Sequence, residues 1–376
     1  MLLHSEAKVE FYRRYLERYL RILALSQTIE EINIYDVFCG TGVYDDGKKG
    51  SPLVALDVIN RIGDEKPLAT SIYLHVNDSN RKKYLSVSDH LVTNNKGYCS
   101  IDCQNQSAEE MFDEIKAQIG KQGRKVRNLL FIDPYGYKEI KKDMLSELLS
   151  NGRTEIILFL PIAQMQRFTS HALSSNDKEY QPLKNFVQSF FADDHVIRSE
   201  TISPLDYIQY LKDALKFGGK HYSTSYYIER DAANYYALFF MTSHLYGFDR
   251  ILEVKWALDE DDGRGFRQTE LVPSMPLLAA LAKEEIRNEH FDRLEKILEA
   301  SLRAGPKDNG AIYAIILQNE FRHAHGTEVF KRWQETRPEF KVLDFNTKEP
   351  VSKGRFYINW DNCRKPYTPK VEFRLE

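Results

Sequence analysis

The chain has 376 residues, a length that favours two or three domains over one. Its composition, with 42% hydrophobic and 28% charged residues, is that of a globular protein and excludes both a disordered chain and a small disulfide-stapled one. The net charge of −3 excludes a general attraction for nucleic acid, although basic patches can exist locally.

The N-terminal segment and the cysteines indicate where the protein works. The first twenty residues have neither the apolar core nor the cleavage site of a signal peptide, and no run of about 18 apolar residues occurs anywhere. No two cysteines have Cys-x-x-Cys spacing, and no histidines stand near them in a zinc-binding pattern. We therefore expect a reduced, cytoplasmic protein with no membrane contact and no metal site.

The chain begins with a predicted helix over residues 5–26, followed by a short buried strand over 31–38 that carries Asp36 near its end. Glycines follow at 40, 42, 47 and 50. Ser51 and Pro52 then start an apolar helix, which we expect to have the serine at its N-cap and the proline at its first position. The predicted order is strand, glycine-rich loop, helix.

Strands and helices continue to alternate along the next hundred residues. Strands are predicted over 71–78, 97–102, 127–133 and 154–162, and helices over 80–93, 108–119 and 141–149. Such alternation produces a parallel sheet with right-handed crossovers. The most apolar strands are expected at its centre, buried on both faces. The predicted fold class is therefore α/β, with a Rossmann-like, mostly parallel sheet of the class I methyltransferase type.

The remainder of the chain extends this domain and adds a second one. We expect a helical insertion over about 164–220, strands over 223–229 and 235–244, and a helix over 247–259. The domain would cover 1–275, and a connecting helix would cover 276–303 and end at Gly305 and Pro306. Residues 304–376 contain two helices, then strands over 340–345 and 354–360. This order predicts a C-terminal winged-helix-like module.

The first chemistry-bearing motif is Asp36-x-Phe38-x-Gly40-x-Gly42, at the end of the first strand. Glycines let the backbone pass close beneath a ligand, and open α/β sheets bind ligands at the carboxyl ends of their strands. The spacing is neither that of a dinucleotide fingerprint nor that of a phosphate loop. The motif therefore predicts a site for S-adenosylmethionine, in which the carboxylate accepts from the cofactor's ammonium or from loop amides. The alternative is a structural tight turn.

Two further aspartates follow the next strands. Asp78 ends the second strand, where an acidic residue commonly accepts hydrogen bonds from ribose hydroxyls. Asp102, at the predicted end of the third strand, would face the adenine amino group. For both residues the alternative is a carboxylate that caps the following helix or turn.

The segment Asp133-Pro134-Tyr135-Gly136 ends the most apolar strand of the chain. A carboxylate there could hold an amine or act as a general base, and the aromatic ring could stack on a flipped nucleic-acid base. Asp133 and Tyr135 are therefore the candidate catalytic residues. The alternative is a strand-ending turn, because Asp-Pro-x-Gly also suits a turn.

Together these segments resemble the three-Cys-motif partner family, TcmP. The resemblance is carried by the first helix with Lys8, by DVFCGTG with the following GSPL, by FIDPYG, and by the segment over 235–259. It implies a class I methyltransferase-like domain whose partner is a three-cysteine-motif protein. DPYG is similar to the Asp-Pro-Pro-Tyr motif of nucleic-acid methyltransferases but lacks one proline.

Two functions follow from these observations. The first is methyl transfer from S-adenosylmethionine to a nucleophile, such as a nitrogen of a nucleic-acid base. The second is a non-catalytic, methyltransferase-like subunit that binds nucleic acid or a three-cysteine-motif protein. A nuclease is disfavoured because the sequence has no dense carboxylate–lysine cluster. Basic residues interleaved with aromatics in the tail are candidate nucleic-acid contacts, namely Lys331, Arg332, Lys353, Arg355, Arg364 and Lys365.

Overall fold

The computed structural model describes residues 3–191, 202–231, 233–260, 263–267, 276–364 and 366–376. The chain divides into two compact units. The first comprises residues 1–254 and 264–270, and the second comprises 255–263 and 271–376. The long helix over 276–303 thus belongs to the second unit, together with the tail.

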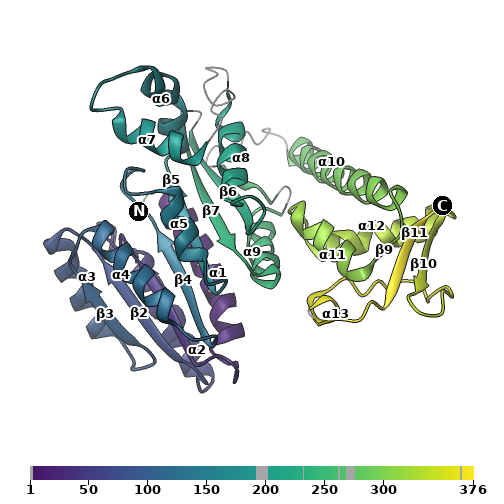
Figure 1. Ribbon diagram of the computed structural model, residues 1–376, viewed down its shortest axis with the longest axis horizontal. Helices are drawn as coiled ribbons and strands as arrows, with labels where there is room; N and C mark the ends of the chain where they lie inside the picture. The colour runs from purple at the N-terminus through teal and green to yellow at the C-terminus, as the bar shows by residue number, and fades with distance from the viewer. Residues whose placement is uncertain (1–2, 192–201, 232, 261–262, 268–275, 365) are drawn as a thin grey trace. The chain divides into compact units, whose positions relative to one another are not determined.

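The first unit is built on one eight-stranded sheet (Figure 1) with the order β3-β2-β1-β4-β5-β7-β6-β8. Its strands are β1 (Glu31–Asp36), β2 (Ser71–Asn77), β3 (Ser100–Gln104), β4 (Val126–Ile132), β5 (Thr154–Leu160), β6 (Tyr222–Asp231), β7 (Asn234–Thr242) and β8 (Gly265–Arg267). The first five strands are parallel, β7 is antiparallel to both its neighbours, and β8, which was not expected, is parallel to β6. The predicted mostly parallel α/β sheet is confirmed. The order 3-2-1-4-5 is that of doubly wound sheets, in which the strand order reverses between β1 and β4.

Helices cover both faces of this sheet. They are α1 (Leu3–Leu23), α2 (Ser51–Glu65), α3 (Arg81–Asn94), α4 (Ala108–Lys121), α5 (Lys142–Leu149), α6 (Ile162–Ser174), α7 (Gln181–Phe190), α8 (Pro204–Ala214) and α9 (Leu245–Leu258). Apolar residues of α4 to α8 share one core with Tyr35, Leu130 and Ile156. On the opposite face, Tyr12 of α1 stacks on Phe131, with ring centroids 4.4 Å apart. The helical insertion predicted over 164–220 is seen as α6, α7 and α8 in its described part.

The start of α2 differs from the prediction in one detail. Gly50, not Ser51, is the N-cap residue, and Ser51 and Pro52 are the first helical residues. Ser51 is buried, and its hydroxyl lies close enough to Asp36 to lower the pKa of that carboxyl, against the larger opposing effect of burial. The Ser51 hydroxyl therefore interacts with the carboxyl group at the end of β1, and it does not cap the first amides of α2.

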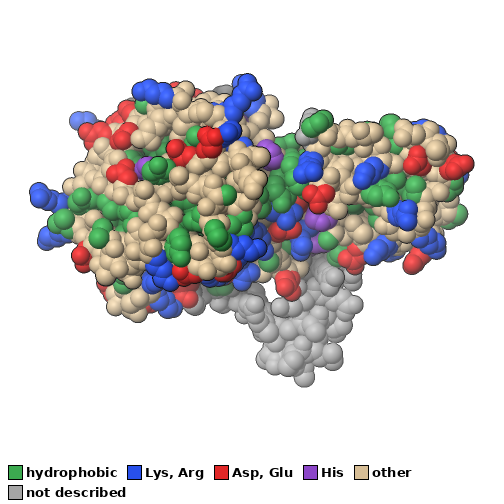
Figure 2. Space-filling view, turned by 90° about the horizontal axis from the view of Figure 1, so that it is seen from below, with side chains coloured by type: hydrophobic (Ala, Val, Ile, Leu, Met, Phe, Trp, Pro, Cys, Tyr) green, Lys and Arg blue, Asp and Glu red, His purple; other side chains and the backbone are tan. Residues whose placement is uncertain are grey.

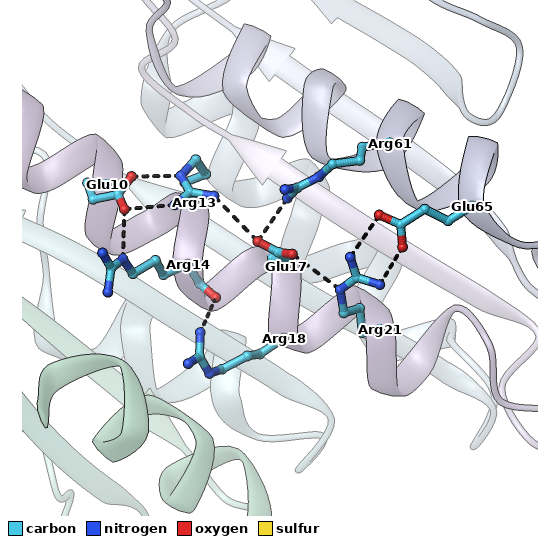
Figure 3. A network of polar contacts seen from close by, with 8 residues as sticks. All are labelled: Glu10, Arg13, Arg14, Glu17, Arg18, Arg21, Arg61 and Glu65. Carbon is cyan, nitrogen blue, oxygen red and sulfur yellow. Dashed lines mark hydrogen bonds and ion pairs between the residues drawn. The ribbon is translucent and has the colours of Figure 1, made fainter. Parts of the chain in front are cut away.

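The outer face of α1 carries a network of charged side chains (Figure 3). Glu10 accepts from Arg13 and Arg14, and Glu17 pairs with Arg13, Arg21 and Arg61 of α2. These pairs are partly exposed, so each contributes little to stability. Because the arginines are matched with glutamates, this face is not an open basic surface. Figure 2 likewise shows basic and acidic side chains interspersed over the visible face of the molecule.

The second unit has a small antiparallel sheet with the order β10-β11-β9. Its elements are α10 (Pro276–Arg303), β9 (Lys307–Asp308), α11 (Asn309–Gln318), α12 (His323–Thr336), β10 (Phe340–Asp344), α13 (Trp360–Cys363) and β11 (Val371–Leu375). Trp333, Phe330 and Phe373 are fully buried in its core, together with Leu298 and Ile316.

The strand predicted over 354–360 was wrong. Phe356 and Ile358 are buried, as their alternation indicated, but Tyr357 between them has a φ of 52°. That left-handed conformation interrupts an extended strand. The place beside β10 is taken by β11 instead, through Val342 and Phe373. Alternation thus identified the buried side chains but not the backbone conformation.

Within the described ranges, no helix is both long and apolar enough to cross a lipid bilayer.

Candidate functional site

Three of the predicted aspartates lie at the carboxyl ends of adjacent strands. Asp36 is level with Phe131 of β4 and with Val76 of β2. Asp133 and Asp78 come two residues after Phe131 and Val76, directly after the last residues of β4 and β2. Because side chains alternate along a strand, Asp36, Asp78 and Asp133 all project toward the same face. This is the α1 face, since Phe131 stacks on Tyr12 of that helix.

The glycine loop after β1 has the conformation that its residues predict. Gly40 and Gly42 both have positive φ angles, 64° and 77°. A methyl group added to Gly40 would meet no atom within 4 Å, so space is open beside it. Gly42 is packed more tightly, because Val87 lies close to its Cα, and its carbonyl accepts from the Gly50 amide at 2.7 Å. Phe38 is half-buried and contacts Phe112 of α4, so it points into the opposite core.

Asp78 fixes the position of this loop. Its side chain accepts from the amide of Gly40 at 3.1 Å and from that of Asn80 at 2.8 Å, and it is 3% exposed. Asn77, which the sequence analysis did not single out, donates to the carbonyl of Val37 at 3.2 Å. The ends of β1 and β2 are thereby held together, with the Asp78 carboxylate beside Gly40.

Asp36 is the most unusual group in the site. Its side chain is fully buried, and neither carboxylate oxygen has a hydrogen-bond partner of good geometry among the described residues. Burial raises the pKa of Asp36 to about 7; the Ser51 hydroxyl, the charge of Lys8 and the Phe38 amide oppose this effect, and the charge of Asp133 adds to it. A buried, unpartnered carboxyl group costs stability, and such groups are characteristic of functional sites.

Asp133 is paired with a lysine from the N-terminal helix. The Lys8 ammonium forms an ion pair and hydrogen bond with the Asp133 carboxylate and lies 4.6 Å from the centre of the Phe159 ring. Burial alone would lower the pKa of Lys8, but the charges of Asp133, Tyr44 and Asp36 outweigh it, and the pKa is raised. Lys8 therefore stays protonated at neutral pH and compensates part of the negative charge of the site.

Tyr135 follows β4 at the same carboxyl end of the parallel strands and is exposed to solvent. It is 75% exposed, an exceptional value for a large aromatic residue, and its hydroxyl contacts the Lys83 ammonium. A pocket of about 610 Å³ lies along the following segment and α7. Four lysines line it, namely Lys138, Lys141, Lys142 and Lys178. The loop after β4 thus presents an exposed ring, and the segment that follows it lines a lysine-rich pocket.

Asp102 does not join the other three aspartates. The predicted end of its strand was wrong, because β3 continues to Gln104 and Asp102 lies inside it, level with His75. The His75 ring stacks on Tyr35, which belongs to the core under α4 to α8. Asp102 contacts His75 Nδ1 at 3.0 Å and accepts from Gln104 at 2.9 Å. It therefore lies on the opposite face of the sheet from Asp36.

Lys8 and Tyr44 are site residues that the sequence analysis did not select. Lys8 stands on the buried stripe of α1 that also carries Tyr12, Tyr15 and Tyr19, and a lysine on such a stripe is itself a signal. Tyr44 follows the glycine loop, and burial raises the pKa of its hydroxyl, with Asp133 and Asp36 adding to the effect. No cluster of three or more potential metal ligands occurs in the described part of the chain.

A pair of glycine substitutions tests the packing of the loop. Gly42 and Gly47 both have positive φ angles, 77° and 79°, so alanine carries a similar backbone penalty at each. Only at Gly42 would the new methyl group lie 2.9 Å from Val87 Cγ2, whereas nothing lies within 4 Å at Gly47. We expect Gly42→Ala to lower the free energy of unfolding by about 1 kcal/mol more than Gly47→Ala. Urea denaturation measures both, and a Val87→Ala background should remove the difference.

No protein-family model matches the chain, and no curated protein is similar to it in sequence. Among solved structures, it is similar to a Legionella pneumophila protein described under the family name DUF519, at 12% identity over 69% of this chain and 91% of that one, with a TM-score of 0.37. It is also similar to the O-methyltransferase TomG from Streptomyces achromogenes, a structure in complex with SAM, at 10% identity over 62% and 80% (TM-score 0.34). An O-methyltransferase from Bacillus cereus in complex with SAH gives 11% over 61% and 80% (TM-score 0.34). These values are too low to transfer a function.

The fold and the site define an α/β protein whose doubly wound half carries acidic side chains at its topological switch point.

Proposed function

We propose that this chain is an S-adenosylmethionine-dependent methyltransferase. One observation carries the proposal: the buried Asp36 carboxylate has no hydrogen-bond partner of good geometry among the described residues, at the end of the central strand β1. The glycine loop beside it leaves space next to Gly40. An ammonium-bearing ligand would supply the missing partner, and the carboxyl ends of strands are where open α/β sheets bind ligands.

The residues fit this cofactor. Asp36 would accept from its ammonium group, Gly40 and Gly42 would let the backbone lie close beneath it, and Asp78 would accept from the ribose hydroxyls. Phe38 supports the glycine loop from the core side. Asp102 lies on the other face of the sheet, beside His75, so it has no place in the proposed cofactor site. When bound, the cofactor supplies an electrophilic methyl group on a sulfonium.

Asp133 and Tyr135 would receive the methyl acceptor. The Asp133 carboxylate lies on the same face as Asp36, where it can orient an acceptor N–H or O–H and take its proton. Lys8 would hold that carboxylate in place through their ion pair. The exposed Tyr135 ring offers a flat surface on which a planar acceptor can stack.

We infer that the acceptor is a nucleic-acid base. The four lysines of the pocket beside α5 would contact phosphates, which would replace the exposed ion pairs of Lys138 with Glu139 and of Lys141 with Glu109. The second unit has the element order α10-β9-α11-α12-β10-α13-β11, with β11 between the other two strands, and two helices followed by an antiparallel strand pair support the proposal of a winged-helix-like module. Several of its basic side chains are already paired, among them Arg332 with Glu295 and Lys348 with Glu372. Lys331, Lys353, Arg355 and Arg364 remain its candidate phosphate contacts, and Lys365 lies outside the described residues.

Titration calorimetry followed by a transfer assay tests this function. We expect the protein to bind S-adenosylmethionine with micromolar affinity and to transfer a labelled methyl group to DNA or RNA oligonucleotides. Asp133→Asn should keep the binding and lower the rate of transfer by about a hundredfold or more, because general-base catalysis contributes about that much. Absence of cofactor binding by a folded protein contradicts the proposal.

One observation favours a second candidate, the non-catalytic subunit. Lys8 already occupies the Asp133 carboxylate, as in a site that no longer receives an acceptor amine. In that case the cofactor binds but no methyl group is transferred, and the chain acts by binding a three-cysteine-motif protein. Binding without transfer, unchanged by Asp133→Asn, supports this candidate over the first.

A further inference from the structure

A second pocket lies at the amino ends of the parallel strands, away from the glycine loop. It has a volume of about 150 Å³ and is formed by the C-terminal half of α1, the first residues of β4 and β5, the end of β7 and the start of α9. Ile156 of β5 is level with Met241 of β7, so the start of one strand meets the end of the other. All of these residues belong to the first unit.

Two arginines line this pocket without a carboxylate partner. Among the described residues, the Arg127 guanidinium donates to the carbonyls of Arg124 and Val126, both at 2.9 Å, and Arg153 Nη2 donates to the carbonyl of Gln122 at 3.0 Å. Neither forms an ion pair with any described residue, and Arg153 Nε is buried without a hydrogen-bond partner there. Burial lowers the pKa of Arg127 and the neighbouring charge of Arg153 adds to this effect, while Tyr19 and Glu155 oppose it. Two partly buried like charges are costly unless an anion joins them.

Aromatic rings form another wall of the pocket. Tyr19 is 6% exposed, and its hydroxyl has no hydrogen-bond partner in the described structure. Tyr15 donates to the buried Glu155 carboxyl, which also accepts from Thr242 Oγ1 at 2.8 Å. Burial raises the pKa of Glu155 to about 7, although the hydrogen bonds from Tyr15 and Thr242 and the charge of Arg127 lower it, so this carboxyl is only about half ionised at neutral pH. The pocket therefore combines two arginines that form no ion pair with a described residue, a phenol without a hydrogen-bond partner there, and the aromatic side chains of α1 beside a half-ionised carboxyl.

We propose that this pocket binds a small aromatic anion, with its carboxylate or phosphate on Arg127 and Arg153 and its ring against Tyr15 and Tyr19. The guanidinium groups supply the paired N–H donors that an oxyanion needs. Tyr19 would donate to the same oxyanion. A cavity of this size accommodates a single benzene ring. This site is separate from the proposed cofactor site and does not depend on methyl transfer.

Calorimetry with four probes tests the proposal: benzoate, phenyl phosphate, inorganic phosphate and the neutral benzyl alcohol. We expect benzoate or phenyl phosphate to bind at least tenfold more tightly than both benzyl alcohol and inorganic phosphate. A preference for benzoate identifies a carboxylate as the bound group, and a preference for phenyl phosphate identifies a phosphate. Equal affinity for benzyl alcohol, or no binding of any probe, overturns the proposal.

Variants locate the binding. Arg127→Gln and Arg153→Gln should each weaken the tighter anion at least tenfold, and Tyr19→Phe several-fold. Arg124→Gln is the matched control, because this exposed arginine is adjacent to the pocket but does not line it. Arg127→Lys keeps the positive charge and so distinguishes loss of charge from misfolding. This variant should bind the anion more tightly than Arg127→Gln does. Similar losses in Arg124→Gln and Arg127→Gln would contradict the assignment.

Discussion

Replacing Asp36 by asparagine is expected to lower the affinity for S-adenosylmethionine about a hundredfold or more and, at the same time, to stabilise the fold. The affinity falls because the cofactor's ammonium would lose a buried opposite charge. The stability rises because this carboxyl is fully buried and has no hydrogen-bond partner of good geometry among the described residues. Opposite changes in binding and stability mark a residue kept for function.

The stability gain should depend on pH in a defined direction. Burial raises the pKa of Asp36 from 3.8 to about 7, so between these values the unfolded chain is ionised while the folded protein holds the proton. The wild-type protein therefore loses stability as the pH rises from about 4 to about 7, and the loss is complete above that range. About three pKa units correspond to about 4 kcal/mol, which is the upper limit of the gain at pH 8. Below about pH 4 the gain should vanish.

Urea denaturation at pH 4 and pH 8, together with calorimetry, measures both effects. Asp57→Asn is the control, because Asp57 lies on α2, is exposed and pairs with Lys49. It should change the free energy of unfolding by less than about 0.5 kcal/mol and leave the affinity unchanged. An Asp36→Asn protein that binds the cofactor as tightly as the wild type would rule out the assigned role of this carboxylate.

The second large effect is expected from Lys8→Met. The substitution removes the cation that faces Asp133 and leaves a partly buried carboxylate unpaired, with 22% of the Asp133 side chain exposed. Breaking such a pair from one side costs about 3 kcal/mol, near the low end for buried pairs because Asp133 keeps some contact with water. Transfer activity should fall as well, since Asp133 would lose its positioning partner.

A double-mutant cycle separates the ion pair from packing. Lys8→Met combined with Asp133→Leu should recover most of the lost stability, because the unpaired charge is then absent. Lys125→Met provides a control, since its pair with Glu30 is exposed on both sides and should contribute less than about 1 kcal/mol. A double variant that is no more stable than Lys8→Met alone would assign the loss to packing instead.

The central part of the fold and site could be predicted because local patterns determine it. Apolar runs that end in Asp36, Asp78 and Asp133, each followed by a helix, place these residues at one edge of a parallel sheet. The period-two alternation of strands then decides which face each side chain takes. The predicted face is correct for Asp36 and Asp133 because the ends of their strands were predicted within two residues.

The parts that were missed depend on long-range packing. Asp102 was misplaced because β3 continues two residues farther, and nothing local distinguishes its end from its middle. Lys8 is 125 positions from Asp133, so their pairing follows from how α1 packs on the sheet. In the second unit, β11 pairs with β10 in place of the expected strand because Tyr357 takes a left-handed conformation that its sequence does not announce.

Helix α1 reaches both ends of the parallel strands, with Lys8 at their carboxyl ends and Tyr19 at their amino ends. Eleven residues of helix extend about 16 Å, and a helix buried along one stripe moves as a rigid rod. Any axial shift of this rod that brings Tyr19 closer to a guest also displaces the Lys8 ammonium. Deleting the first two dozen residues would therefore remove side chains from the Asp133 site and from the second pocket at the same time.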